Sequence, residues 1–335
     1  MPAPITDDRP IRWGILGAGS IADTVCSDLR LTTGNVVTAV AARDADRAAA
    51  FAATHGAERS YGTYEELVAD DAVDVVYVAT THPNHHRQAL MAIAAGKAVL
   101  VEKPVCLHAG RAREVFEAAR AADVFSMEAM WTRTNPLVRK AQELVAQGVI
   151  GEVQHVRASF GVGVPFDPTH RLYDLDNGGG SLLDLGIYPI TIASLFVGLP
   201  DRSTWDGSLS PAGADETVAM QWTRGGRPTA QLLSSASVAT SNDAVISGTT
   251  GFLRLEGYSH RPDGLTVSAG GETYRIDDPL AGVGSGYTPE VEEVERCLRA
   301  GLLESPLVPH ADTIAIQELM DEGLAALGVV YPQDA

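Results

Sequence analysis

The stretch IRWGILGAGSIA, residues 11–22, decides the fold of the start of the chain. Its first half, residues 11–16, is apolar, too short for a helix and closed by glycines, which is typical of a buried strand. Helical spacing follows at Ile21, Val25 and Leu29. The chain therefore begins with a strand that turns directly into a helix.

The turn between this strand and this helix fits the dinucleotide pattern G-x-G-x-x-A. Gly17 permits the tight turn, Gly19 lets the backbone approach a pyrophosphate, and Ala22 allows close packing of the helix on the strand. The helix N-terminus supplies amide donors for an anion. We therefore predict a dinucleotide site that includes Gly17, Gly19, Ser20 and Ile21, with a simple tight turn as the alternative.

Strand and helix patterns continue to alternate up to residue 125. The further expected strands are 36–43, 73–80 and 98–104, and the further expected helices are 44–56, 64–70, 84–96 and 109–123. Such alternation predicts a parallel sheet with crossover helices, the doubly wound Rossmann class of α/β domain.

After residue 150 the pattern changes, because β-rich segments now follow one another with turn residues between them. The expected strands are 152–161, 216–224, 228–237, 243–249, 251–257 and 265–277, and the expected helices are 135–148, 181–198, 289–301 and 312–328. We predict an α+β domain with a large open, mostly antiparallel sheet. A length of 335 residues also favours two domains, which we place at 1–128 and 129–335.

The end of the second expected strand bears on the choice of nucleotide. NAD-preferring sites usually hold the ribose 2′-hydroxyl with an acidic residue there, but this strand ends in Arg43 followed by Asp44. A guanidinium pairs with a 2′-phosphate, and Arg47 lies one helical turn further on the same side. We therefore favour NADP over NAD and expect Asp44 to cap the next helix. The alternative leaves Arg43 in solvent and puts Asp44 on the ribose.

Residues 98–104, AVLVEKP, end a valine-rich strand on two opposite charges and a proline. Ligands of parallel sheets lie at the carboxyl ends of the strands, so we expect Glu102 and Lys103 at the mouth of the nucleotide crevice. Pro104 is a candidate cis proline, because cis bonds occur in constrained turns.

The chain resembles the glucose-fructose oxidoreductase, inositol dehydrogenase and rhizopine protein (Gfo/Idh/MocA) family over nearly its whole length, in three motifs: VEKPVCL (101–107), MEAMWTRTNP (127–136) and GGGSLLDLGIYPI (178–190). The last two motifs resemble the family's dimeric dihydrodiol dehydrogenase and xylose dehydrogenase branch. Many other family members carry His where this chain has Tyr188, a departure that favours this branch.

The resemblance implies roles for individual residues. It implies that Lys103 is the catalytic lysine and that Asp184 and Tyr188 are a functional pair. It implies contacts to the cofactor from Thr80, His82, Asn84, His85 and Lys103. We expect Glu102 to contact the nicotinamide ribose or to hold the loop. It makes Trp131, Arg133, Phe160 and His170 candidates for the substrate pocket, with core packing as the alternative for Phe160, and Arg171 and Asn177 candidates for binding hydroxyls. It also implies a homodimer formed through the C-terminal sheet.

The residue chemistry supports a proton-transfer role independently. Asp184 and Tyr188 are four residues apart on an expected helix and so share one face. A free tyrosine has a pKa of about 10, too high for a base near neutrality, and a nearby ammonium from Lys103 would lower it. We hypothesise that Tyr188 is the acid/base for the alcohol proton, that Lys103 polarises the oxygen, and that Asp184 orients the substrate or the lysine.

The composition disfavours nucleic acids and membranes as partners. The formal net charge of -18 opposes nucleic acid and anionic membrane surfaces. The start, MPAPITDDRP, has neither a basic region nor an apolar core, and the sequence lacks the roughly 20 unbroken apolar residues of a membrane span, so we expect a cytoplasmic protein.

The cysteines and histidines point to neither disulfides nor a metal. Cys26, Cys106 and Cys297 are odd in number and far apart in sequence, so we expect reduced thiols. The segment THPNHH, residues 81–86, invites a metal hypothesis, but its spacing fits no zinc template and we expect no metal.

We therefore expect an NADP-dependent oxidoreductase that transfers hydride between the nicotinamide and a secondary alcohol or carbonyl of a sugar, cyclic polyol or trans-dihydrodiol. One alternative is a non-catalytic NADP-binding sensor, which the intact set of Lys103, Asp184 and Tyr188 disfavours. Another is an NAD-dependent glycosidase of the same fold, which Arg43 disfavours.

Overall fold

The computed structural model describes residue 5 and residues 8–334. The chain forms two compact units: the part up to Trp131 together with Gly282–Ile314, and Thr132–Ala281 together with the part from Ala315. Gly282–Ile314 thus groups with the first unit, although the expected boundary leaves all of 129–335 in the second. Helix α9 (His310–Leu327) begins in the first unit and ends in the second.

The first unit contains a 6-stranded sheet in the order β3-β2-β1-β4-β5-β6, and all its strand pairs are parallel. The strands are β1 (Ile11–Leu16), β2 (Asn35–Ala41), β3 (Arg59–Tyr61), β4 (Val75–Val78), β5 (Ala98–Glu102) and β6 (Ser126–Ala129). The predicted doubly wound class is confirmed. Strands β3 and β6 were not predicted, because 3 and 4 residues are too few to show a strand period.

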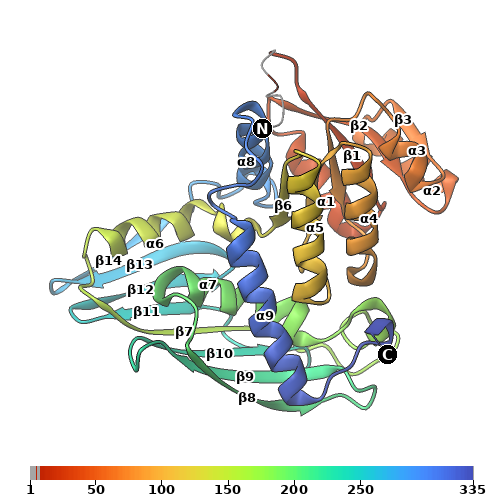
Figure 1. The fold of residues 1–335 in the computed structure, drawn as a ribbon. Coiled ribbons are helices and arrows are strands. Elements are labelled where there is room, and N and C mark those ends of the chain that lie inside the picture. Colours follow the sequence, from red (N-terminus) through yellow and green to blue (C-terminus); the bar gives the residue numbers. More distant parts are fainter. Residues whose placement is uncertain (1–4, 6–7, 335) are drawn as a thin grey trace. The chain divides into compact units, whose positions relative to one another are not determined.

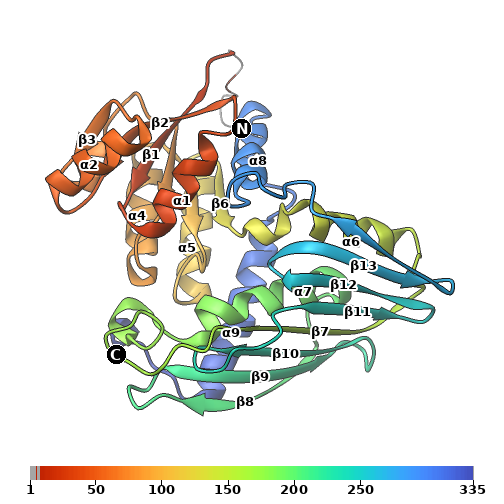
Figure 2. The same ribbon diagram turned by 180° about the vertical axis from the view of Figure 1, so that it is seen from behind.

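Helices cover both faces of this sheet. They are α1 (Ser20–Leu29), α2 (Ala45–His55), α3 (Tyr64–Val68), α4 (His82–Ala94), α5 (Ala109–Ala121) and, from the returning segment, α8 (Thr288–Arg299). Helices α4 and α5 pack side by side in front of the sheet in Figure 1. Helix α1 lies on the opposite face, in front in Figure 2, where α8 packs against it. The strands are consequently buried on both sides, and β4 and β5 have no exposed residue.

The second unit contains an 8-stranded sheet in the order β14-β13-β12-β11-β7-β10-β9-β8. The strands are β7 (Val153–Gly161), β8 (Arg202–Leu209), β9 (Asp215–Thr223), β10 (Thr229–Ser235), β11 (Ala244–Gly248), β12 (Gly251–Tyr258), β13 (Arg261–Ala269) and β14 (Glu272–Asp277). Among the described strands of this sheet, only the β7–β10 pair is parallel. The predicted mostly antiparallel sheet is confirmed. Strand β8 was not predicted, because its side chains are mostly exposed and polar.

Helices α6 (Pro136–Ala146) and α7 (Ile187–Val197) pack on this sheet, α6 on β12 and β13 and α7 mainly on β7 and β10. A π-helix, Leu182–Gly186, leads directly into α7. The segment Leu175–Val197 is the one described stretch whose length and hydropathy would allow a membrane span. Its most apolar window is 83% buried inside the structure, as in the core helix of many proteins, so this is weak evidence for a span.

Candidate functional site

The glycine loop joins β1 to α1 in the first unit. Gly17 has φ +100, and a Cβ on it would come within 2.8 Å of the Ala79 carbonyl oxygen, so only glycine fits there. Gly19 is the N-cap of α1, yet no side chain caps the helix, and a Cβ on Gly19 would meet nothing within 4 Å. An open space in front of uncapped amide donors fits a pyrophosphate. Ser20 is exposed and Ile21 half-buried at the same helix start.

Two of the charged residues after β2, Asp44 and Arg47, serve the protein's own structure. Asp44 is the N-cap of α2 and accepts a hydrogen bond from the Arg47 amide at 3.0 Å, as predicted. Arg47 donates from Nε and Nη2 to the Ala18 carbonyl oxygen at 3.0 and 2.6 Å, so it braces the glycine loop. Arg43 is exposed at the carboxyl end of β2.

The Glu102–Lys103 turn is held by carboxylates from two neighbouring strands. Glu102 ends β5 and accepts hydrogen bonds from the Tyr77 hydroxyl and, at 3.2 Å, from the Lys103 amide. Glu128 on β6 accepts one from the Val105 amide at 3.1 Å. The Lys103–Pro104 bond is cis, as predicted. The half-buried Lys103 therefore stands on a turn fixed on both sides.

A third carboxyl group lies close to this turn. Glu290 on α8 is fully buried, and neither of its oxygens has a hydrogen-bond partner within the described part of the chain. Burial, together with the charges of Glu102 and Glu128, raises the pKa of Glu290 well above its ordinary range. The shift favours the neutral form of Glu290, which avoids a third negative charge in the interior.

His85 supports the same region from α4. Its ring is fully buried, with Nδ1 2.9 Å from the Pro104 carbonyl oxygen and Nε2 3.1 Å from the Thr80 carbonyl oxygen. Burial lowers the pKa of His85 even though both carbonyl contacts act in the opposite direction. His85 thus links the end of β4 to the Lys103–Pro104 turn.

Thr80, His82 and Asn84 of the same loop are half-buried. The Thr80 hydroxyl donates to Gln88 Oε1 at 2.6 Å, and Asn84 Nδ2 donates to the Thr81 hydroxyl at 2.9 Å. The His82 ring lies edge-on to His85, with ring centroids 5.7 Å apart.

These residues meet at one edge of the parallel sheet. Leu16 on β1 pairs with Ala41 on β2 and with Val78 on β4, and Val78 pairs with Val101 on β5. The glycine loop, the Arg43 turn, the Thr80 loop and the Glu102–Lys103 turn all follow these strand ends. They lie at the carboxyl ends of the strands, where parallel sheets bind ligands.

Trp131 belongs to the first unit and stacks on Tyr287, with ring centroids 4.1 Å apart and an interplanar angle of 6°. Asp28, on α1 and 1% exposed, accepts hydrogen bonds from the Ser285 and Tyr287 amides at 2.7 to 2.9 Å. The returning segment is thereby anchored, which positions Tyr287 against Trp131.

In the second unit, a buried carboxyl group caps the N-terminus of the helix that carries Asp184 and Tyr188. Asp215 is fully buried, and its Oδ2 accepts hydrogen bonds from Ser181 Oγ at 3.0 Å and from the Leu182 amide at 2.5 Å. Burial raises the pKa of Asp215 to about 7, although both donors act in the opposite direction. A side chain from a remote strand therefore caps this helix.

Asp184 lies in the π-helical turn and is 3% exposed. Arg171, whose side chain is 66% exposed, forms an ion pair with it at 2.8 Å between Nη1 and Oδ2. The buried carboxyl group of Asp184 is thus paired with a cation at the surface of the unit.

Tyr188 lies in an aromatic cluster, which we define as Phe160, Tyr188, Tyr258 and His260. The His260 ring stacks on Tyr188 with centroids 4.5 Å apart and an interplanar angle of 28°. The Phe160 ring lies 4.5 Å from His260 and 5.7 Å from Tyr188. Tyr188 and Phe160 are 7% and 8% exposed, so both rings are largely covered but reach the surface of the unit.

Three further predicted residues of this unit are Arg133, His170 and Asn177. Arg133 is 6% exposed. His170 accepts a hydrogen bond from the Leu172 amide at 3.2 Å, and the exposed Asn177 donates to Asp174 at 2.6 Å.

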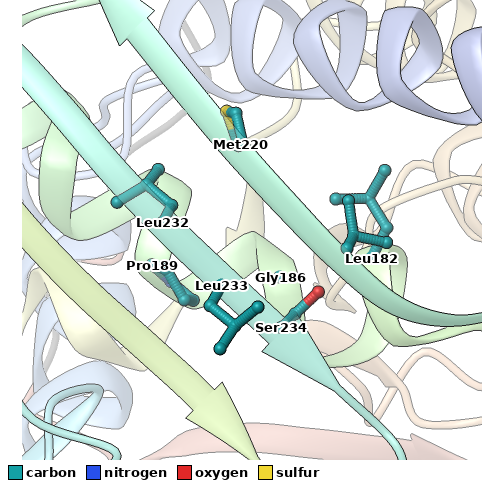
Figure 3. Close-up of a pocket in the computed structure, with 8 residues that line it drawn as sticks. Leu182, Gly186, Pro189, Met220, Leu232, Leu233 and Ser234 are labelled. Atoms are coloured by element: carbon teal, nitrogen blue, oxygen red, sulfur yellow. The ribbon is translucent and has the colours of Figure 1, made fainter. Parts of the chain in front are cut away.

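A small apolar hollow lies behind the same helix. Figure 3 shows Leu182, Gly186 and Pro189 of the helix facing Met220 of β9 and Leu232 of β10. Its apolar lining and its room for about one water molecule do not suit a sugar or a nucleotide. We regard it as a packing gap opened by the π-helical turn.

The three cysteines are free and buried. Burial raises the pKa of Cys26 to about 12 and also raises that of Cys106, so neither thiol is poised for reaction. Within residues 8–334 no group of three or more His, Cys, Asp or Glu side chains could hold a metal ion.

Sequence reasoning missed several residues at these sites, namely Tyr77, Glu128, Asp215, His260, Tyr287 and Glu290. Glu128 and Glu290 are buried carboxyl groups, and a carboxyl group in the interior is a signal that was available once their elements were assigned to the interior. His260 lies in a polar turn and gave no comparable signal.

Comparisons with known proteins agree with this architecture. The model of an oxidoreductase family with an NAD-binding Rossmann fold, Gfo/Idh/MocA, matches residues 11–129, and the model of the Gfo/Idh/MocA C-terminal domain matches residues 138–254. The trans-1,2-dihydrobenzene-1,2-diol dehydrogenase of Mus musculus is 40% identical over 97% of this chain and 99% of its own length. The Homo sapiens enzyme of that name is 35% identical over the same shares.

A solved structure agrees as well. A 3-ketoreductase from Actinomadura kijaniata, in complex with NADP and TDP-benzene, is 27% identical with a TM-score of 0.83, over 95% of this chain and 98% of that one.

Proposed function

Because the chain belongs to the Gfo/Idh/MocA oxidoreductase family, we propose that it is an NADP-dependent dehydrogenase that oxidises a secondary alcohol of a trans-dihydrodiol, sugar or cyclic polyol, or reduces the matching carbonyl. The observation that carries the proposal is the aromatic cluster around Tyr188 on the helix that also holds Asp184. A wall of rings beside a phenol and a carboxylate suits a cyclic substrate that carries hydroxyl groups.

The named relatives support this substrate class. The mouse and human proteins are named for an aromatic trans-dihydrodiol. We rank a trans-dihydrodiol first and a sugar or cyclic polyol second.

We assign the proton step to this chain's own residues. Tyr188 takes the alcohol proton during oxidation and returns it during reduction. Lys103 polarises the substrate oxygen and favours the tyrosinate, and Asp184 orients the substrate. NADP, when bound, supplies the nicotinamide carbon that exchanges hydride with the substrate.

We assign the cofactor to the edge of the first unit's sheet. Gly17, Gly19 and the uncapped start of α1 would hold the pyrophosphate. Arg43 would pair with the 2′-phosphate, because it is exposed at the end of β2 while Arg47 is engaged with the glycine loop.

A titration of the purified protein with NADPH and separately with NADH is the first test, followed by nicotinamide absorbance across dihydrodiols, aldoses, polyols and dicarbonyls. We expect tighter binding of NADPH and turnover on one class. Arg43→Ala should weaken NADPH binding about 10-fold or more and leave NADH binding unchanged. The exposed Arg30, replaced by alanine, is the matched control.

The same panel separates the alternatives. Tight NADPH binding without turnover on any member would favour a sensor, and release of a sugar from glycosides would favour a glycosidase. Equal binding of NADPH and NADH to the parent protein would contradict the assignment of Arg43.

We further propose a homodimer formed through the outer face of the 8-stranded sheet. Both Figure 1 and Figure 2 show helices on one face of this sheet only. On the outer face a cross-strand row runs over seven strands through Gln221, Gln231, Arg157, Val245, Arg254, Thr266 and Arg275. An open face of this size suits a symmetric pair. Light scattering should give twice 35.3 kDa, and a mass of 35.3 kDa would contradict the dimer.

We also propose a cytoplasmic location, because three free buried thiols suit a reducing compartment. Fractionation of cells that express the tagged protein tests this. Recovery in the membrane or secreted fraction would contradict it.

A further inference from the structure

His260 is in closer stacking contact with Tyr188 than the other rings of the aromatic cluster. Its ring centroid lies 4.5 Å from that of Tyr188, and the two planes differ by 28°. Phe160 is 5.7 Å away and tilted by 56°. The imidazole therefore covers a face of the phenol, whereas Phe160 approaches it at an angle.

The position of His260 is set by its backbone. It lies in the turn between β12 and β13, where Tyr258 pairs with Arg261. The Thr132 hydroxyl, in a side chain that is 0% exposed, donates to the His260 carbonyl oxygen at 3.1 Å. The Ser259 amide donates to the Asn242 carbonyl oxygen at 2.6 Å.

The turn also has a built-in bend. The pairing register shifts between Glu256 and Gly257, and Gly257 has φ +68. A Cβ on Gly257 would come within 2.9 Å of Asp263 Oδ2. Because the turn is held at several points, the His260 imidazole has a fixed position next to Tyr188.

We propose that His260 is a positioning residue for Tyr188: its stacked imidazole fixes the plane of the phenol ring and so aims the hydroxyl that exchanges the substrate proton. The inference rests on the proposed role of Tyr188. Tyr188 itself follows the π-helical turn 182–186, a less regular segment than an α-helix, so its ring depends on contacts beyond its own helix. An acid/base displaced by about 1 Å can lose about 100-fold in rate.

Two substitutions test the stacking. His260→Ala removes the ring, and we expect kcat to fall about 10-fold or more while the Kd for NADPH stays unchanged. His260→Phe keeps a flat ring, and we expect it to restore kcat to within about 3-fold of the parent. His155→Ala is the matched control, because His155 lies on β7 of the same unit and bonds Thr229.

Either of two results would overturn the inference. The first is a kcat within about 2-fold of the parent for His260→Ala. The second is a loss in His260→Phe as large as in His260→Ala, because the polar atoms of the imidazole would then matter and not its stacking.

A double-mutant cycle with Tyr188→Phe separates the inference from the proposed function. If His260 acts through Tyr188, His260→Ala causes no further loss of kcat in the Tyr188→Phe background. A full additional loss would mean that His260 acts independently, which overturns the positioning role and leaves Tyr188 intact as the acid/base. Turnover within a few-fold of the parent in Tyr188→Phe alone would instead remove the proposed role of Tyr188.

Discussion

Tyr188 and Lys103 have the most demanding chemical roles in the proposed mechanism. Losing a positioned acid/base typically costs about 100-fold or more in rate. We expect Tyr188→Phe and Lys103→Met each to lower kcat by at least that factor, with cooperative unfolding unchanged by circular dichroism. Lys140→Met, at a half-buried surface residue paired with Glu143 on α6, is the matched control. Turnover near the parent value in both site variants would contradict the mechanism.

Because Asp215 caps the helix that carries Tyr188, its ionisation makes the stability of the protein depend on pH. Its folded-state pKa of about 7 lies above the ordinary value of 3.8. Since folding raises the pKa of Asp215, this group makes its full contribution to the free energy of unfolding below pH 3.8. That contribution is lost as the pH rises through about 7.

We therefore expect Asp215→Asn, which resembles the protonated form, to raise Tm relative to the parent at pH 8 but not at pH 4. At pH 8 the expected difference in the free energy of unfolding between the variant and the parent is as much as a few kcal/mol. Thermal unfolding followed by circular dichroism across this range measures it, with Asp206→Asn at an exposed site of β8 as control. A difference that is the same at pH 4 and pH 8 would contradict the titration of Asp215.

At the scale of the element, the segment 178–197 depends on how its first turn is built. Gly180 has φ +134, and a Cβ there would come within 2.3 Å of Asp215 Oδ1. The Tyr331 hydroxyl donates to the Gly179 carbonyl oxygen at 3.0 Å and anchors the turn from the C-terminal side. The helix can start at Ser181 only because the preceding backbone adopts a conformation that side chains disfavour.

We expect Gly180→Ala to destabilise the protein by about 1–3 kcal/mol, or several degrees in Tm, and to lower kcat because the helix carries Tyr188. Gly110→Ala in α5 is the matched control, since a Cβ there meets nothing within 4 Å. It should leave Tm unchanged or slightly higher. Equal Tm values for the two variants would show that the turn tolerates a side chain.

At the scale of the whole molecule, charge is the dominant feature. The chain has 43 acidic and 25 basic residues, excluding histidine. Like charges on a compact protein repel one another, and salt screens this repulsion over about 10 Å at 0.1 M. We expect Tm at pH 7.5 to rise between 10 and 200 mM NaCl, with an equal osmolarity of sucrose as the comparison. A Tm that falls with salt would mean that ion pairs such as Arg12–Asp74 outweigh the repulsion.

Much of the fold and part of the site could be predicted from the sequence because they depend on local patterns. The glycine loop, the Asp44 cap and the cis bond at Pro104 each follow from neighbouring residues. The pairing of Arg171 with Asp184 was beyond prediction, since the two residues come together only through the path of the loop between them.

The sequence by itself determined the two sheet classes, the order of most helices and strands, and the family of the chain. These follow from hydrophobic periodicity, turn residues and short motifs, which act over a few residues. Only the tertiary structure decided that 282–314 returns to the first unit, bringing Glu290 near Glu102, and that His260 lies on Tyr188. Such contacts join residues far apart in the chain, and they are set by packing and burial, which no local pattern records.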